Sequence, residues 1–327
     1  MGRRGAYMMK QSAVYITRCD IGWYSKNANA YLKPLEIAQK YRTTLCVCKD
    51  CRVPREIEDQ CEAIVRFGGL RGLLKPHNTL NAREGGLLFT GFDFPCMYKA
   101  WQLKKKFGCK WTIFLWDPPS LRWRDGLPPL RWAIDAVFRF FARRCDRLML
   151  NIHPGLLDEI GYKPREGQLE LRMQDAWANA KCKIENVKME SVPYEYDFGV
   201  LSNWERGKGG PLMVEAMAKM PGKRCLWIGN PPRDGKVRVG IEFAGRLSQE
   251  EAFARLKKCR VLVVPYLPTR ALKWNYPLKL YEYLQIGRPI VSSDNPGNVT
   301  IAAKYPGRIT LFKSGDVDEL TAKLRSE

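Results

Sequence analysis

Short apolar runs alternate with amphipathic stretches along the first half of the chain, and this alternation predicts strands and helices in turn. Residues 12–18 and 43–48 are predicted strands, and residues 31–41 between them form a predicted helix. A strand, a helix and a strand in this order build parallel sheets. Further predicted elements are strands at 63–67, 86–90, 111–116 and 146–151, and a helix at 130–144. The polar, glycine-bearing connection 68–85 is predicted to be a long loop.

The second half of the chain alternates more regularly than the first. Its predicted strands, with helical stretches between them, are 198–201, 224–228, 241–244, 261–264, 289–292 and 308–311. This pattern predicts a Rossmann-like domain. Residues 184–193 are strand-like and residues 194–197 are a predicted connector, so we place a domain boundary there. The predicted fold class is α/β, with an N-terminal domain at 1–193 and a C-terminal domain at 194–327.

The segment 275–289 predicts a short helix that is followed by a buried strand. Pro277 suits the first helical turn because its φ is already helical, and Gly287 can end the helix in the left-handed conformation. Lys279 and Glu282 are three residues apart and therefore share one face. The amides at the helix N-terminus suit a phosphate, and a carboxylate further along could accept hydrogen bonds from a ribose diol. These features predict half of a nucleotide site, although an ordinary capped helix with a surface ion pair would show them too.

A glycine-rich turn at 205–210 follows the first strand of the second half and precedes a predicted helix at 212–220. Its backbone amides and Lys208 can bind a phosphate.

The run Asn-Tyr-Pro-Leu-Lys-Leu-Tyr-Glu-Tyr-Leu at 275–284, with Gly-Arg-Pro-Ile-Val at 287–291, resembles the donor-binding element of GT-B-fold glycosyltransferases. The likeness is greatest to those related to glycosyltransferase family 4. It implies two Rossmann-like domains that face each other across a cleft, the second for a nucleotide-diphosphate sugar and the first for the acceptor. It also implies that Glu282 holds the ribose of the nucleotide sugar and that the helix start faces its diphosphate.

The resemblance extends to other donor-binding residues. Lys208 matches the lysine of the family's glycine-rich turn, and Arg206 can substitute for an arginine that the family often has earlier in that turn. The remaining candidates around the donor are Asn275, Tyr276, Pro277, Leu278, Lys279, Arg270 and, in the first loop, Gly22. Many members carry a glutamate near the transferred sugar where this chain has Trp274 beside Asn275. The donor sugar and the stereochemistry therefore stay open.

Three aspartates are candidates for the general base. Asp117 follows the apolar strand 113–116, at the edge where open α/β sheets bind ligands. Asp93 and Asp20 are alternatives, and each of the three could instead be a turn aspartate that binds its own backbone. If the enzyme inverts configuration, Asp117 is the best base. If it retains configuration, no nucleophile for a double displacement is evident.

The net charge of +21 predicts attraction to a polyanion, which is either nucleic acid or an anionic membrane face. No apolar run is long enough to cross a bilayer, and the N-terminus lacks the apolar core of a signal peptide. We therefore expect a cytoplasmic protein that could be peripheral on the inner membrane face. The helix 130–144 could lie on a membrane, but we expect its apolar stripe to pack against the sheet.

The eleven cysteines have no small-scaffold rhythm, which favours reduced thiols. Four of them could ligate zinc or an iron–sulfur cluster, but their spacing differs from paired Cys-x-x-Cys knuckles: Cys46, Cys48, Cys51 and Cys61. Asp316 and Asp318 resemble a metal clamp, yet we expect them to cap the last helix. Lys208 and Arg206 can stabilise a departing diphosphate, so we expect no metal and no cofactor.

These expectations combine into an enzyme that moves a sugar from a nucleotide-diphosphate sugar to a hydroxyl. The acceptor is expected to be a glycan or lipid-linked molecule at an anionic membrane surface. One alternative is a DNA glycosyltransferase of the phage type that modifies hydroxymethylated bases. A sugar-nucleotide epimerase and a non-catalytic nucleic-acid-binding protein are alternatives from other classes. The oligomeric state stays open.

Overall fold

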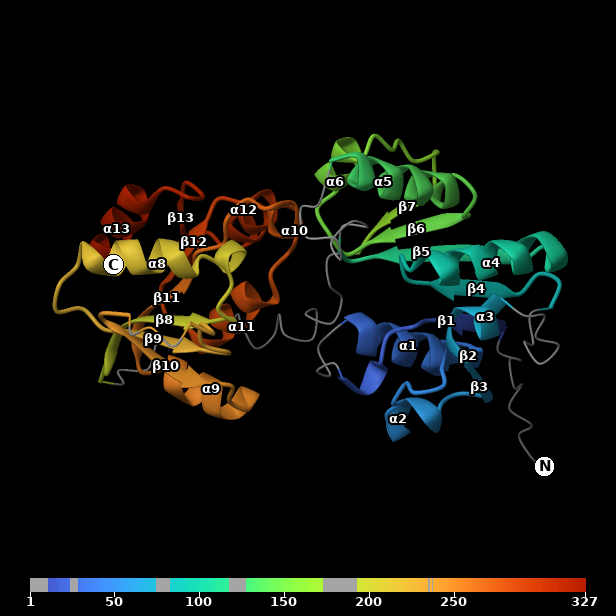
Figure 1. The fold of residues 1–327 in the computed structure, drawn as a ribbon, viewed down its shortest axis with the longest axis horizontal. Helices are drawn as coiled ribbons and strands as arrows, with labels where there is room; N and C mark the ends of the chain where they lie inside the picture. Colours follow the sequence, from blue (N-terminus) through green and yellow to red (C-terminus); the bar gives the residue numbers. More distant parts are fainter. Residues whose placement is uncertain are drawn as a thin grey trace, which may run out of the picture. The chain divides into compact units, whose positions relative to one another are not determined.

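The structure, a computed structural model, describes residues 11–23, 29–74, 83–117, 128–172, 193–234, 236 and 238–327. The chain divides into two compact units, Met1–Ala176 and Trp177–Glu327 (Figure 1). The predicted domain boundary between 193 and 194 adjoins the segment 173–192, which lies outside the described residues. That boundary stays a prediction, as does the strand-like stretch at 184–192.

In its described part, the N-terminal unit forms a seven-stranded parallel sheet with the strand order β3-β2-β1-β4-β5-β6-β7. The strands are β1 (Ser12–Ile16), β2 (Arg42–Cys48), β3 (Ala63–Phe67), β4 (Leu87–Thr90), β5 (Lys110–Leu115), β6 (Arg147–Leu150) and β7 (Leu169–Leu171). The helices are α1 (Asn29–Lys40), α2 (Arg55–Glu58), α3 (Gly69–Leu74), α4 (Phe94–Phe107), α5 (Pro128–Ala142) and α6 (Gly155–Glu159), with a 3₁₀ turn η1 (Ile21–Trp23).

One predicted loop in this unit is partly helical. Residues 69–74 of the predicted loop 68–85 form the short helix α3. Leu73 is buried, and Gly72 lies so close to Phe67 that a Cβ atom on it would be 3.4 Å from the Phe67 carbonyl carbon. Local packing of one leucine therefore orders a segment whose composition predicts a loop. Residues 75–82 of the same loop lie outside the described residues.

The C-terminal unit, as far as it is described, forms a six-stranded parallel sheet with the order β10-β9-β8-β11-β12-β13. The strands are β8 (Tyr196–Leu201), β9 (Cys225–Ile228), β10 (Ile241–Gly245), β11 (Cys259–Val264), β12 (Ile290–Ser293) and β13 (Ile309–Phe312). The helices are α8 (Gly210–Ala218), α9 (Gln249–Leu256), α10 (Arg270–Lys273), α11 (Leu278–Ile286), α12 (Pro296–Lys304) and α13 (Val317–Ser326), with a 3₁₀ turn η4 (Arg206–Lys208).

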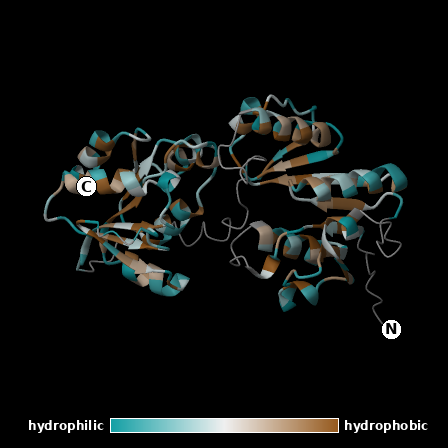
Figure 2. Cartoon of the chain, in the orientation of Figure 1, coloured by the Kyte–Doolittle hydropathy of each residue, from teal (hydrophilic) through white to brown (hydrophobic). Residues whose placement is uncertain are grey.

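Both sheets are hydrophobic in the middle and are covered by helices, as parallel sheets require (Figure 2). In the C-terminal unit, Phe198, Trp227 and Val261 are fully buried in one core cluster. In both units the strand order follows the 3-2-1-4-5-6 pattern of the Rossmann fold, with one more strand at the edge of the N-terminal sheet. The prediction of two Rossmann-like domains is therefore confirmed.

The strand order reverses between β1 and β4 in one sheet and between β8 and β11 in the other. In open α/β sheets, ligands bind beyond the carboxyl ends of the strands at this reversal. The segments that follow β8 and β11 are the glycine-rich turn and the stretch that leads into α11. These two segments together with α11 contain all but one of the predicted donor-binding residues, the exception being Gly22.

Candidate functional site

Helix α11 forms where the sequence predicts it. Pro277 is the N-cap residue, one position before the first turn in which we expected it, and Gly287 ends the helix with a φ of +84°. The Gly287 N–H donates a hydrogen bond to the Tyr283 carbonyl, 3.1 Å away. Leu280 and Leu284 are fully buried and fix the rotation of the helix. The face that carries Lys279 and Glu282 is thereby set.

Glu282 is buried on this helix, with only 7% of the residue exposed. The Lys279 Nζ lies 2.9 Å from its Oε2, so the predicted pairing across one turn is confirmed. Apart from this ion pair, Oε2 accepts no hydrogen bond from the described residues. A buried carboxylate oxygen with unused hydrogen-bonding capacity costs free energy. An exposed ion pair would not carry that cost. The burial of Glu282 therefore argues against the alternative of an ordinary capped helix with a surface ion pair.

Tyr283 attaches α11 to the reversal point of the sheet. Its hydroxyl accepts a hydrogen bond of 2.6 Å from the Leu201 N–H and donates one of 3.5 Å to the Val263 carbonyl. Strands β8 and β11 pair as far as Gly199 and Leu262. The buried hydroxyl therefore sits between the two strands near their carboxyl ends, which positions the neighbouring Glu282 at that edge.

The glycine-rich turn after β8 is held tightly against the loop after β11. Gly209 has a φ of +80°, and a Cβ atom on it would lie 1.9 Å from the Pro265 carbonyl oxygen. The Leu267 N–H donates a hydrogen bond of 2.9 Å to the Gly207 carbonyl. Only glycine fits at position 209, because any side chain would meet the backbone of the other loop.

The same turn brings a cation to the start of a helix. Helix α8 begins at Gly210, directly after the turn. Lys208 is half-buried, and its Nζ lies 5.5 Å from the centre of the Tyr266 ring. Arg206 is exposed on the same turn. An ammonium group beside unpaired helix amides is a suitable environment for a phosphate.

The segment before α11 is fixed by helix α12. A Cβ atom on Gly297 would lie 1.9 Å from the Asn275 carbonyl oxygen, so the two backbones are in direct contact. The Asn275 Oδ1 is buried and accepts no hydrogen bond from the described residues. Tyr276 is buried beside it, and Arg270 is buried at the start of α10.

Three further residues at this edge are missing from the sequence-based prediction. Ser202, Asn295 and Asn298 follow the carboxyl ends of β8 and β12, and all three are buried. Each has one side-chain oxygen without a hydrogen-bond partner among the described residues. The polar run Ser-Ser-Asp-Asn at 292–295, at the end of a buried strand, is the sequence feature that could have indicated one of them, Asn295.

In the N-terminal unit, the three candidate bases follow three neighbouring strands. Asp20, Asp93 and Asp117 come after β1, β4 and β5, so all three lie at the carboxyl edge of that sheet. Trp116 connects the last two of these segments, because it packs edge-on against Phe92 at 5.8 Å between ring centres. The structure therefore brings the three segments to one edge.

The structural partners of Asp93 and Asp20 are clear. Asp93 is the N-cap of α4, where it accepts a hydrogen bond of 3.4 Å from the Cys96 N–H, as the turn interpretation expects. Asp20 accepts hydrogen bonds from the Arg52 backbone N–H at 2.8 Å and from its guanidinium at 2.9 and 3.0 Å. These bonds lower the pKa of Asp20, which makes it a weaker base. Gly22 packs on the same residue, since its N–H donates to the Arg52 carbonyl at 2.7 Å.

Within the described residues, no group of three or more His, Cys, Asp or Glu side chains could hold a metal ion. Among the four cysteines considered as ligands, the Cys51 thiol donates a hydrogen bond to the Cys19 carbonyl, and burial raises the pKa of Cys61 to about 11. Asp316 caps α13, as expected, by accepting hydrogen bonds from the N–H groups of Asp318 and Glu319. Independence from metals stays a prediction.

Several solved structures of other proteins are similar to this one over nearly the whole chain. Sucrose-phosphate synthase from Thermosynechococcus elongatus has a similar structure, with a TM-score of 0.66 and 15% identity over 97% of this chain and 89% of that one. HepE from Anabaena, solved in complex with UDP, has a TM-score of 0.66 and 14% identity over the same shares. A glycosyltransferase from Rickettsia africae has a TM-score of 0.61 and 9% identity over 97% of this chain and 88% of that one. A search of curated protein sequences gives no match.

Residues 196–326, which include the Lys208 turn and the Glu282 helix, match the family described as glycosyl transferases group 1. The C-terminal unit matches a glycosyltransferase family, and the chain as a whole has the two-domain fold of the GT-B structures that it resembles. This match supports the predicted glycosyltransferase class, and dependence on a nucleotide sugar is taken up below as a proposal. Assignment of the glycosyltransferase to family 4 in particular stays a prediction. No helix in the described part of the chain has the length and hydropathy needed to cross a bilayer.

Proposed function

We propose that this glycosyltransferase binds a nucleotide-diphosphate sugar at the carboxyl edge of its C-terminal sheet and transfers the sugar to an acceptor hydroxyl. One observation carries the proposal: five buried side-chain oxygens lie on the segments around this edge and, apart from the ion pair of Glu282 with Lys279, have no hydrogen-bond partner among the described residues. They belong to Ser202, Asn275, Glu282, Asn295 and Asn298. Buried polar atoms are almost always paired, so a concentration of unpaired acceptors indicates a place for a polar ligand.

The chemistry of these groups fits the parts of a nucleotide sugar. The Glu282 carboxylate can accept hydrogen bonds from two adjacent ribose hydroxyls. Lys208, Arg206 and the first amides of α11 can neutralise the diphosphate, and this preorganised charge would stabilise it as the leaving group. Asn275 and Arg270, which precede α11, are the candidates nearest to the transferred sugar. HepE, which was solved with UDP and with UDP-glucose, supports the choice of donor class.

For the acceptor we propose a hydroxyl of a glycan or of a lipid-linked molecule. If the reaction inverts configuration, Asp117 is the proposed general base, because it follows β5 at the carboxyl edge of the N-terminal sheet. The alternative acceptor is a hydroxymethylated base of duplex DNA, which the net charge of +21 also favours.

The donor site is tested by calorimetric titration with a panel of nucleotide sugars and with the free nucleoside diphosphates. We expect Glu282→Gln to weaken nucleotide binding by about tenfold or more, which corresponds to about 1.4 kcal/mol or more. The matched control is Glu36→Gln in the N-terminal unit, because Glu36 pairs with Lys33 at the same sequence spacing and the same distance of 2.9 Å. Equal binding by the Glu282 variant and the wild type would refute the assignment.

A further inference from the structure

Helix α5 has an apolar outer face as well as an apolar inner face. Ile134, Phe138 and Phe141 are buried toward the sheet, which confirms the predicted packing. At the margin of this buried face, Leu130 and Val137 are 40% and 42% exposed, at a spacing of seven residues. Sheet packing therefore uses one face of this helix and leaves other apolar side chains open to solvent.

The outer face is extended by aromatic side chains. Trp132 is 68% exposed and Phe140 is 39% exposed on α5. Trp101 of α4 lies 5.6 Å from Phe140 and 5.8 Å from Tyr98, measured between ring centres. We call this surface the α4–α5 face, and its residues are Tyr98, Trp101, Leu130, Trp132, Val137 and Phe140.

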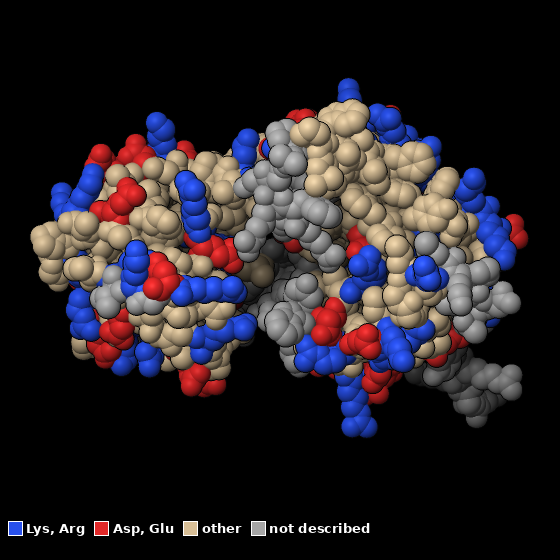
Figure 3. All heavy atoms as spheres, viewed as in Figure 1, with Lys and Arg blue, Asp and Glu red and all other residues tan. Residues whose placement is uncertain are grey.

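The charges around this face are of one sign. Residues 94–107 and 128–144 contain eight Lys or Arg residues and a single acid, Asp135, which is buried. Two cations lie on rings of this face: Arg144 is 3.4 Å from the centre of the exposed Phe140 ring, and Lys105 Nζ is 4.8 Å from that of the half-buried Trp101. Where Figure 1 places α5, Figure 3 shows a mainly tan surface with Lys and Arg at its margins.

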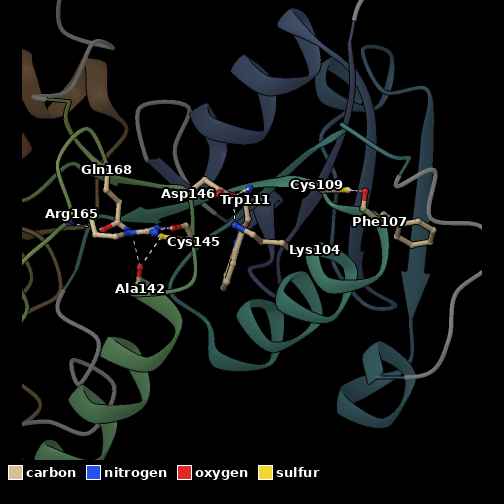
Figure 4. Close-up of polar contacts among 9 residues, drawn as sticks. All are labelled: Lys104, Phe107, Cys109, Trp111, Ala142, Cys145, Asp146, Arg165 and Gln168. Carbon is tan, nitrogen blue, oxygen red and sulfur yellow. Dashed lines mark hydrogen bonds and ion pairs between the residues drawn. The ribbon is translucent and has the colours of Figure 1, made fainter.

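Both helices are fixed to the sheet beneath them (Figure 4). Lys104 of α4 pairs with Asp146, whose Oδ2 also accepts a hydrogen bond of 2.7 Å from the Trp111 N–H of β5. At the end of α5, the Gln168 side chain donates to the Ala142 carbonyl at 2.7 Å. The exposed rings are thus presented by a rigid scaffold, which lowers the entropy that binding would cost.

We propose that the α4–α5 face docks the glycosyltransferase on an anionic lipid surface. Exposed Trp and Tyr rings suit the headgroup region of a bilayer, Leu and Val side chains suit the acyl boundary, and long cationic side chains can reach anionic headgroups while their stems lie in the apolar layer. Duplex DNA would use the cations but would leave the apolar groups in water. Charge complementarity and the absence of an exposed acid on both helices select an anionic partner, and the exposed apolar side chains select a lipid surface over DNA.

The proposal deepens the proposed function, since it names the surface at which a lipid-linked acceptor would be met. It is measured without any donor, so its failure is distinct from failure of nucleotide binding. The measurement is flotation of the full chain with vesicles of phosphatidylcholine alone, and with vesicles that also contain phosphatidylglycerol at about three parts in ten. We expect binding to the anionic vesicles only.

Two variant pairs separate the face from overall charge. Arg131→Glu with Arg143→Glu should weaken vesicle binding by about tenfold or more, whereas Lys236→Glu with Arg246→Glu, which changes the net charge equally on the C-terminal unit, should change it by less than about twofold. Trp132→Ser with Val137→Ser should also weaken binding by about tenfold, whereas Val239→Ser, at an exposed valine of the other unit, should not.

Thermal unfolding of every variant checks that it is folded, which is expected because the substituted side chains are exposed. Equal losses for the two charge pairs would show that only the net charge matters and would overturn the proposal. Binding of duplex DNA together with no binding to anionic vesicles would overturn it as well.

Discussion

Glycine positions show most directly how single residues hold the donor site together. The turn after β8 can approach the loop after β11 only because Gly209 lacks a side chain and adopts a positive φ. The backbone contact that results places Lys208 beside the start of α8. The position of Lys208 therefore depends on the absence of a Cβ atom at Gly209.

We therefore expect Gly209→Ala to destabilise the protein by about 3 kcal/mol or more, because left-handed strain adds to a backbone clash. Gly222 provides the matched control: its φ is +83°, but a Cβ atom there would meet nothing within 4 Å. Gly222→Ala should cost only the strain, about 1–2 kcal/mol. The comparison is made by chemical denaturation followed by circular dichroism. Equal effects at the two positions would contradict the role given to the Pro265 contact.

The pair of Asp20 and Arg52 leads to a prediction about pH. Hydrogen bonds from Arg52 lower the pKa of Asp20 in the folded protein. Its contribution to stability is therefore present above the ordinary aspartate pKa and is lost as the pH falls through the lowered value. Arg52→Ala should move the pKa of Asp20 back toward its ordinary range, as measured by NMR titration of the carboxyl carbon. Arg66→Gln, which changes a neighbouring cation, should leave that titration unchanged.

Among the secondary-structure elements, α11 shows what the sequence can and cannot predict. Its position and its glycine stop follow from local rules about Pro277 and Gly287. The burial of Glu282 does not, because it depends on how Tyr283 docks between two strands that are distant in sequence. For the same reason, Ser202, Asn295 and Asn298 could not be assembled into one site from the sequence, since the sheet alone brings their segments to one edge.

Helix α5 shows a second limit. Apolar residues at helical spacing predict that one face packs on the sheet, and the structure confirms this. When both faces are apolar, periodicity cannot say which face is covered, so the exposed side of the helix becomes evident only from packing. Strand β7 and helix α3 are short, and their formation depends on neighbours rather than on their own pattern.

We expect Tyr283→Phe to destabilise the C-terminal domain by about 1–3 kcal/mol, because the Leu201 N–H would lose its hydrogen bond inside the protein. The ring itself stays, so no cavity is created. The free energy of unfolding from denaturant titration measures this change. Nucleotide affinity should also fall, since α11 would lose its tie to β8. An unchanged stability would show that the hydroxyl is not needed to hold the strands.

On the scale of the whole molecule, the net positive charge and the proposed donor site would bind their partners through different kinds of interaction. The excess of 55 basic over 34 acidic residues acts over long distances and is weakened by salt. The proposed donor site would act through buried groups such as Glu282, which salt screens less. The two kinds of binding should therefore respond differently to ionic strength.

Raising the salt concentration from about 50 to about 300 mM should weaken binding to anionic vesicles by more than about tenfold. Over the same range, the dissociation constant of the nucleotide sugar should change by less than about fivefold. Flotation and calorimetry on one preparation measure the two effects. Parallel losses would mean that the nucleotide is held mainly by exposed charges, contrary to the geometry around Glu282.

The contact at Gly297 separates two tasks that a donor site must perform. Gly297 of helix α12 contacts the Asn275 backbone directly, because it has no side chain. Glu282 lies on a different helix, α11, which Tyr283 attaches to the sheet. The methyl group added by Gly297→Ala would displace the segment around Asn275, which we propose lies near the transferred sugar. The proposed contacts of Glu282 with the nucleotide would stay unchanged. Such a variant should bind the free nucleoside diphosphate normally yet lose its preference among nucleotide sugars, which ratios of kcat/KM would reveal. A single substitution at position 297 would then change the preference for the sugar without changing the binding of the nucleotide.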